Sequence, residues 1–131
     1  MAHAMVVDDS RAIRKLLGNI LRDIGYDVSE AGNGREALEA VAACTVPLSL
    51  ILTDWNMPEM NGLEFLKAVR AQSKYDAVPV IMVTTETEMD NMVAALEAGA
   101  NEYVMKPFTR EILADKLRLA GIHVPDEQPL T

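Results

Sequence analysis

Five reactive side chains are spread over about a hundred residues of the sequence: Asp8, Asp9, Asp54, Thr84 and Lys106. Carboxylates that lie close together repel one another and raise each other's pKa unless a cation sits among them. A hard divalent ion such as Mg²⁺ takes oxygen ligands, keeps several waters and suits carboxylates at an open edge. A carboxylate can also attack phosphorus, while a metal ion and a lysine neutralise the transferring phosphoryl group. If the fold brings these five side chains close together, they would form a magnesium site for phosphoryl transfer, with the Thr84 hydroxyl as a hydrogen-bond donor.

The elements that would position these residues are apolar runs of strand length. The run Leu48 to Thr53 leads into Asp54, and the stretch Pro58 to Gly62 that follows cannot be regular structure. We expect Trp55, beside Asp54, to be half exposed at the rim of the site. Strands are predicted over residues 4–7, 27–31, 48–53, 79–84 and 103–106.

Helices are predicted between the strands and after the last one, because apolar residues recur there at helical spacing. Ser10 can cap the first helix and Gly25 stands where a left-handed C-terminal cap belongs. The predicted helices run to residue 24 from about residue 13, and over about 35–43, 62–71, 87–98 and 109–120. Five alternating strands and helices give an α/β, doubly wound parallel sheet. Its strands end at one edge, where the five reactive side chains should converge.

Composition narrows the range of partners. Twenty acidic and twelve basic residues give a net charge of −8, which disfavours binding to nucleic acid or anionic lipid. The single cysteine, Cys44, excludes an internal disulfide and a cysteine-rich zinc site and fits a reducing compartment. No apolar run has the length of a membrane span, and no signal-peptide core precedes the first aspartates. We therefore expect a soluble, cytoplasmic protein with no membrane or nucleic-acid partner.

Taken one at a time, the aspartates could be helix caps or solvated turn residues. That interpretation weakens when complementary residue types end several strands. Asp8-Asp9, the segment from Asp54 to Gly62, Val83-Thr84 and Lys106-Pro107-Phe108 together resemble the receiver domain of two-component response regulators, especially single-domain chemotaxis regulators. The resemblance covers about residues 4–120. It implies a flavodoxin-like fold with strand order 2-1-3-4-5.

The resemblance also implies roles for individual residues. Asp54 would be the phosphoacceptor, and Asp8, Asp9, Asp54 and the backbone carbonyl of Asn56 would hold Mg²⁺. Lys106 would contact the phosphoryl group.

Further roles concern switching and phosphoryl lifetime. Thr84 would be the switch hydroxyl and Tyr103 the switch aromatic, turning inward on phosphorylation. Asn56 and Glu86 would set the lifetime of the phosphoryl group, which we expect to be short because water can approach past these side chains.

The resemblance implies a phosphorylation-controlled binding module and not an enzyme beyond its own phosphorylation and dephosphorylation. We expect one receiver domain over residues 1–121, a flexible tail over 122–131, no output domain, and a monomer. Its partners would be a sensor histidine kinase and a protein target on the face formed by the predicted helix 87–98, strand 103–106 and helix 109–120. The predicted helix 87–98 begins with Thr87-Glu88-Met89-Asp90, so a partner that recognises a basic patch should bind poorly.

Two other functions stay open from the sequence. A phosphorelay intermediate or phosphate sink would pass the group to a histidine phosphotransfer protein. A haloacid-dehalogenase-like phosphatase also uses an aspartate and magnesium, but it needs an Asp-x-Asp pattern after its first strand, and here Ser10 stands two positions after Asp8.

Overall fold

The computed structural model describes residues 2–85 and 88–125. Strands and helices alternate along the chain, as the apolar patterns predict. In order they are β1 (Ala2–Val7), α1 (Arg11–Ile24), β2 (Tyr26–Ala31), α2 (Gly34–Ala43), β3 (Leu48–Thr53), α3 (Gly62–Arg70), a 3-10 helix η1 (Ser73–Tyr75), β4 (Val80–Thr84), α4 (Met89–Glu97), β5 (Glu102–Met105) and α5 (Arg110–Leu119).

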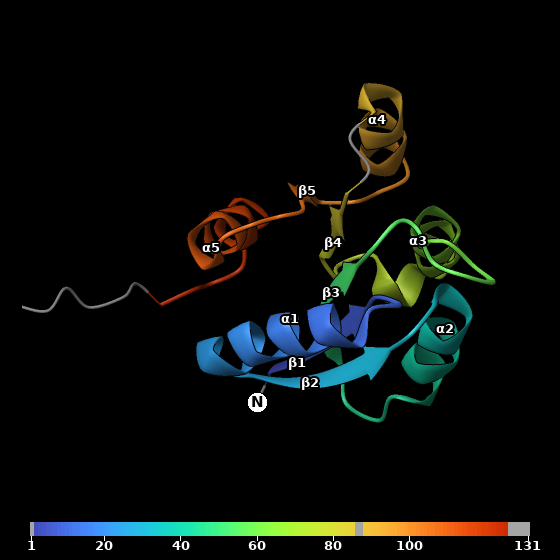
Figure 1. Ribbon diagram of the computed structural model, residues 1–131. Helices are drawn as coiled ribbons and strands as arrows, with labels where there is room; N and C mark the ends of the chain where they lie inside the picture. Colours follow the sequence, from blue (N-terminus) through green and yellow to red (C-terminus); the bar gives the residue numbers. More distant parts are fainter. Residues whose placement is uncertain (1, 86–87, 126–131) are drawn as a thin grey trace, which may run out of the picture.

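The five strands form one parallel sheet in the order β2-β1-β3-β4-β5. This confirms the predicted fold class and strand order. Helices cover both faces of the sheet, and α4 stands beside its β4–β5 end (Figure 1).

Side chains that alternate along the strands enter two separate cores. Met5, Ile51 and Met82 point into the core beneath α2, α3 and α4, whereas Val6 and Leu52 point into the core beneath α1 and α5. Because both faces of the sheet are buried, the strands read as nearly continuous apolar runs. The strand ends carry the polar residues.

Polar side chains cap the helices where the sequence places suitable residues. Ser10, Asn61 and Thr109 each accept a hydrogen bond from a backbone N–H in the first turn of α1, α3 and α5. Gly25 ends α1 in the left-handed conformation, as predicted. Helix α4 begins at Met89; the predicted start, Thr87, lies outside the described residues.

Arg70, the last residue of α3, ties several loops together. Its Nε donates to the carbonyl of Gly99, and its two terminal nitrogens donate to the carbonyls of Tyr75 and Val78. These bonds join the end of α3 to η1, to the start of β4 and to the turn after α4.

The chain beyond α5 begins with packed residues. Ile122 and Val124 are buried in the core beneath α1 and α5, and the Ile122 N–H donates to the carbonyl of Leu117 at 2.9 Å. Two apolar side chains at the start of the segment 122–131, which is expected to be a flexible tail, thus reach the core, and residues 126–131 lie outside the described residues. Among the described residues, no helix is long and apolar enough to span a bilayer.

Candidate functional site

The site lies where β1 and β3 end. Asp54 N–H donates to the carbonyl of Val7 at 2.9 Å, and Asp8 N–H donates to the carbonyl of Ala31 at 3.1 Å. These bonds continue the parallel ladder one residue beyond the strands and fix the backbone of both aspartates. The predicted convergence of Asp8 and Asp54 is confirmed.

Three carboxylates gather at this edge. Asp8, Asp9 and Asp54 can each offer one oxygen such that all three oxygens lie within 4.8 Å of one another. Asp8 and Asp54 are only 1% and 7% exposed, whereas Asp9 is exposed, so the cluster opens to solvent on the Asp9 side. An open set of carboxylate oxygens suits Mg²⁺, which keeps part of its water shell.

Lys106 reaches between two of these carboxylates. Its Nζ donates to Oδ2 of Asp8 at 2.7 Å and to Oδ2 of Asp54 at 3.1 Å. Burial acts to lower the pKa of Lys106, but the hydrogen bond to Asp8 and the charge of Asp54 outweigh it, so this pKa is raised. The lysine therefore stays cationic at neutral pH, and three carboxylates with one ammonium leave two negative charges, which match a divalent ion.

Asp8 carries the perturbed carboxyl group of the site. Its pKa is raised, chiefly because burial disfavours the charged form, while hydrogen bonds from Lys106 and from the Ser10 N–H act in the opposite direction. The charge of Asp54 is the smallest of the causes. Repulsion among the carboxylates, which the sequence analysis considered, thus contributes to the raised pKa of Asp8, but burial is the larger effect.

The loop after β3 is shaped by Gly62. A Cβ atom at this position would lie 1.9 Å from the carbonyl oxygen of Asp54, and the Gly62 N–H donates to the Trp55 carbonyl at 2.8 Å. Only glycine permits this close approach. The start of α3 is thereby held against the backbone that carries Asp54.

Thr84 ends β4 at the same edge and is fully buried. Its carbonyl accepts a hydrogen bond from the Lys106 N–H at 2.9 Å, which links the end of β4 to the residue that contacts both aspartates. Tyr103 lies opposite Met82 on the neighbouring strand, and its ring is buried in the core beneath α2, α3 and α4. The inward position of this aromatic ring is thus the one that the structure shows.

Other predicted residues lie at the margin or elsewhere. Asn56 is exposed two residues beyond Asp54, and Glu86 lies outside the described residues. Trp55 is 9% exposed and packs in the same core as Phe65, so the expectation of a half-exposed ring was wrong. The chain direction after β3 places its side chain on the covered face of the sheet.

Sequence reasoning missed Arg14. Its Nη1 donates to the carbonyl of Asp8 at 2.7 Å, and its Nε donates to Glu30 at 3.2 Å. The sequence held a partial signal, because Arg14 stands about one helical turn after the Ser10 cap, near the point where the chain leaves β1. Arg14 fixes the backbone of Asp8 to α1 and β2.

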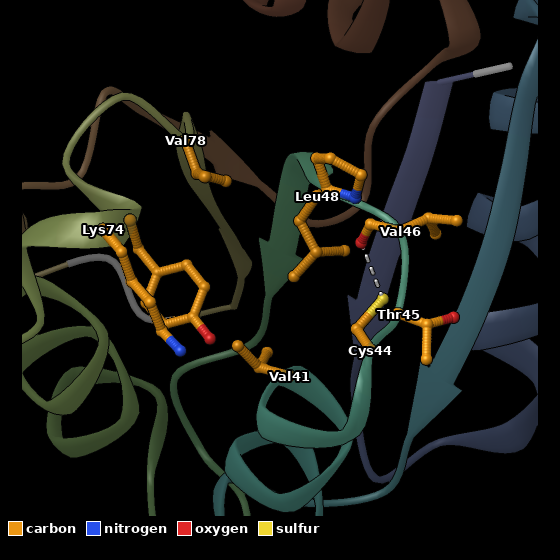
Figure 2. A pocket seen from close by; sticks show the side chains of 9 residues that line it. Val41, Cys44, Thr45, Val46, Leu48, Lys74 and Val78 are labelled. Carbon is orange, nitrogen blue, oxygen red and sulfur yellow. Dashed lines mark hydrogen bonds between the residues drawn. The ribbon is translucent and has the colours of Figure 1, made fainter.

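A shallow cleft of about 260 Å³ lies away from this site (Figure 2). It is lined by the end of α2, the residues that lead into β3, and η1, including Val41, Leu48 and Tyr75. Because Leu48 begins β3 and Asp54 follows its end, the cleft is at the opposite end of the sheet from the carboxylates. The candidate site is therefore the acidic edge and not this cleft.

Comparison with known proteins places the chain in a family. The response regulator receiver domain model matches residues 4–118. The chain belongs to the response regulator receiver family. It is 46% identical over 116 residues to chemotaxis protein CheY1 of Helicobacter pylori, covering 88% of this chain and 93% of the relative. It is 47% identical over 114 residues to a CheY homologue of Campylobacter jejuni, covering 86% and 87%.

Solved structures agree with this assignment. Chemotaxis response regulator CheY4 of Vibrio cholerae superposes with a TM-score of 0.82 at 42% identity, covering 92% of this receiver domain and 98% of that chain. A CheY-like receiver domain of Methanospirillum hungatei superposes with a TM-score of 0.79 at 32% identity, covering 90% and 91%. Receiver domains are signalling modules of two-component systems that bind Mg²⁺ at an acidic pocket, and this receiver domain has the corresponding cluster at Asp8, Asp9 and Asp54.

Proposed function

We propose that this receiver domain accepts a phosphoryl group on Asp54 from a sensor histidine kinase and relays the signal to a protein target in chemotaxis-like signalling. The observation that supports this proposal is Lys106, which contacts both Asp8 and Asp54 beside the exposed carboxylate of Asp9. The ammonium group of Lys106 is one permanent cation of the site. The two negative charges that remain on the carboxylates fit a second, exchangeable cation.

Each residue has a distinct part in the proposed reaction. A carboxylate oxygen of Asp54 forms a bond to phosphorus as the bond to the donor's leaving group breaks, which gives an acyl phosphate. Lys106 neutralises charge that develops on the phosphoryl oxygens. Asp8, Asp9, Asp54 and the Asn56 carbonyl would hold Mg²⁺, which supplies further charge neutralisation when bound.

Phosphorylation should require Asp54 and a divalent cation. With acetyl phosphate and Mg²⁺, intact-mass measurement should show one added phosphoryl group on the wild type and none on Asp54→Asn. Asp27→Asn, an exposed aspartate on β2, is the matched control and should label like the wild type. Equal labelling of Asp54→Asn and Asp27→Asn would overturn the assignment.

Asp9→Ala should label only at higher Mg²⁺, because it removes an anionic oxygen that offsets dehydration of the ion.

The proposed switch uses Thr84 and Tyr103. Phosphorylation adds about one negative charge at Asp54, which attracts the Thr84 hydroxyl, and the space that this hydroxyl leaves in the close-packed interior beneath β5 would stabilise the ring of Tyr103 in the inward position that it already has in the structure. A target that prefers the inward arrangement then binds more tightly.

Thr84→Ala should still accept phosphate but lose most of the phosphorylation-dependent gain in target affinity. Calorimetry with a natural target measures this gain, which we expect to be about tenfold in the wild type. An equal gain in Thr84→Ala would show that the coupling bypasses the hydroxyl.

The exposed Asn56, together with Glu86, would keep the phosphorylated state short-lived, and a half-life of hours would contradict this part of the proposal.

A further inference from the structure

The cleft beside the starts of β3 and β4 has an apolar interior that is open to water. Val41 and Val78 are buried, Leu48 and Tyr75 are half-buried, and Val46 is 48% exposed. The side chains of Val41 and Leu48 point into the space between α2 and η1 (Figure 2). A concave and mostly apolar surface with few polar groups is typical of sites that bind small molecules.

A single cation stands at this cleft. Among the lining residues, all of which belong to the described part of the chain, Lys74 alone is charged. Its Nζ lies 5.0 Å from the centre of the Tyr75 ring, so the ammonium group stands over an aromatic wall. The net charge of the chain is −8, which offers anions no general attraction. An anion in the cleft would therefore be held by this local cation.

Hydrogen bonds fix both walls of the cleft. On the η1 side, Arg70 donates to the carbonyls of Tyr75 and Val78, each at 2.8 Å. On the α2 side, the Cys44 thiol donates to the carbonyl of Val46 at 3.2 Å. A site whose walls are already in place loses less conformational entropy when a ligand binds. The cleft is thus formed before any ligand arrives.

We propose that this cleft binds a small carboxylate with a hydrocarbon chain, whose carboxylate pairs with Lys74 and whose chain lies against Val41 and Leu48. The volume of about 260 Å³ has room for roughly eight or nine non-hydrogen atoms, since a water-sized group takes about 30 Å³. One ammonium group matches one negative charge, which favours a carboxylate over a phosphate dianion.

The position of the cleft separates this inference from the proposed function. Leu48 begins β3 and Asp54 follows its end, so a ligand here would lie at the opposite end of the sheet from the carboxylate cluster. It would compete neither with Mg²⁺ nor with a phosphoryl group. The inference therefore adds a second binding site to the receiver domain.

Hexanoate and hexanamide are matched probes, because they have the same number of non-hydrogen atoms and differ in charge. Titration of the full chain at neutral pH, followed by ¹H–¹⁵N NMR, should give saturable shifts of the Val46, Leu48 and Val78 amides with hexanoate. We expect a Kd of about 1 mM for so small a ligand, and at least about fivefold weaker binding of hexanamide. Equal binding of the two probes, or shifts that do not saturate, would overturn the inference.

Matched lysine variants separate the cleft from the overall charge. Lys74 and Lys15 are both exposed, and Lys15 belongs to α1, which packs on the other face of the sheet. Lys74→Gln should weaken hexanoate binding at least about fivefold and leave hexanamide binding unchanged, while Lys15→Gln should change neither. Equal weakening by both variants would mean a response to net charge alone and would refute a defined site.

A matched pair of valines tests the apolar contact. Val46 at the cleft and Val93 on α4 are 48% and 43% exposed, so shortening either one should leave the fold intact. Val46→Ala should weaken binding of hexanoate about threefold, because it removes apolar surface from the cleft, and Val93→Ala should leave binding unchanged. The reverse result would place the ligand on α4 and overturn the inference.

Cys44 gives an independent readout, because it is the only cysteine of the chain and it lines the cleft. Saturating hexanoate should slow alkylation of this thiol by iodoacetamide several-fold in the wild type, and the same concentration should slow it far less in Lys74→Gln. None of these measurements needs Mg²⁺ or a phosphoryl donor, so failure of Asp54 labelling would leave their result standing. An alkylation rate that hexanoate does not change would contradict binding in the cleft.

Discussion

Helices α1 and α4 both start just beyond a strand that ends at the acidic edge, yet they are held very differently. Helix α1 buries Leu17, Gly18, Ile20 and Leu21, whereas α4 buries Ala95 alone. Burial of leucine and isoleucine side chains contributes about 1.5–3 kcal/mol each, and one alanine contributes far less. The acidic edge thus has one firmly packed side and one lightly packed side.

The two helices also differ in charge. Helix α1 carries four basic residues and one acidic residue, while α4 carries two acidic residues and no basic one. The proposed metal and phosphoryl chemistry would therefore depend on the firmly packed side, where Arg14 fixes the backbone of Asp8, whereas the lightly packed α4 should open locally at a lower cost in free energy.

The largest expected effect on stability comes from shortening a buried leucine of α1, and an exposed leucine of α4 serves as its comparison. Leu21→Ala should lower the free energy of unfolding by about 2–5 kcal/mol, because Leu21 is fully buried and a cavity would remain. Leu96→Ala should change it by less than about 0.5 kcal/mol, since much of that side chain already faces water. Urea unfolding measures both changes in the free energy of unfolding. Similar losses in the two variants would contradict the difference in packing between α1 and α4.

Hydrogen exchange should sharpen the comparison without any substitution. Backbone amides of α4 should exchange at least about tenfold faster than those in the centre of α1, because fewer apolar contacts oppose local opening. Exchange followed by NMR at neutral pH gives residue-level rates. Equal protection of the two helices would show that α4 is held by contacts other than those that bury Ala95.

The smallest expected effect concerns Asp8, which belongs to the firm side. Its pKa is raised mainly by burial, so the folded state holds this proton more tightly than the unfolded state. Stability should therefore fall as pH rises from the unfolded pKa of 3.8 through the higher folded pKa, and the penalty should persist at neutral pH.

Asp8→Asn removes that penalty and should unfold at slightly higher urea than the wild type at pH 7 in a chelator. Added Mg²⁺ should stabilise the wild type and leave Asp8→Asn nearly unchanged. Asp9→Asn is the control for the metal-free comparison, because Asp9 is exposed. If Asp8→Asn unfolded at lower urea than the wild type in chelator, burial would not dominate at this carboxyl group.

The backbone framework and the meeting of Asp8, Asp54 and Lys106 could be predicted from the sequence. Apolar runs that end in polar residues define the strands, and a parallel sheet brings their carboxyl ends to one edge. Short polar residues before apolar periodicity located helix starts, as Ser10 and Thr109 show. These signals are local, so they survive without knowledge of the tertiary contacts.

Side-chain placement at the ends of elements could not be predicted in the same way. Whether Trp55 faces water or core depends on how α3 closes over the end of β3, which the close approach at Gly62 decides. Ile122 is buried because the turn after α5, held by its N–H bond to the carbonyl of Leu117, directs its side chain into the core beneath α1 and α5. The dominance of burial at Asp8 likewise depends on neighbours that are distant in sequence.

The hydrogen bonds of Arg70 give α4 a fixed pivot. Gly99, which follows the helix, has its carbonyl held by the Arg70 Nε at 3.1 Å, and a Cβ atom there would lie 2.9 Å from the same nitrogen. Any rotation of α4 that keeps this contact must be smallest near Gly99 and largest at Met89. The guanidinium group of Arg70 in α3 therefore anchors the C-terminal end of α4, which is the end remote from Thr84 and the acidic edge.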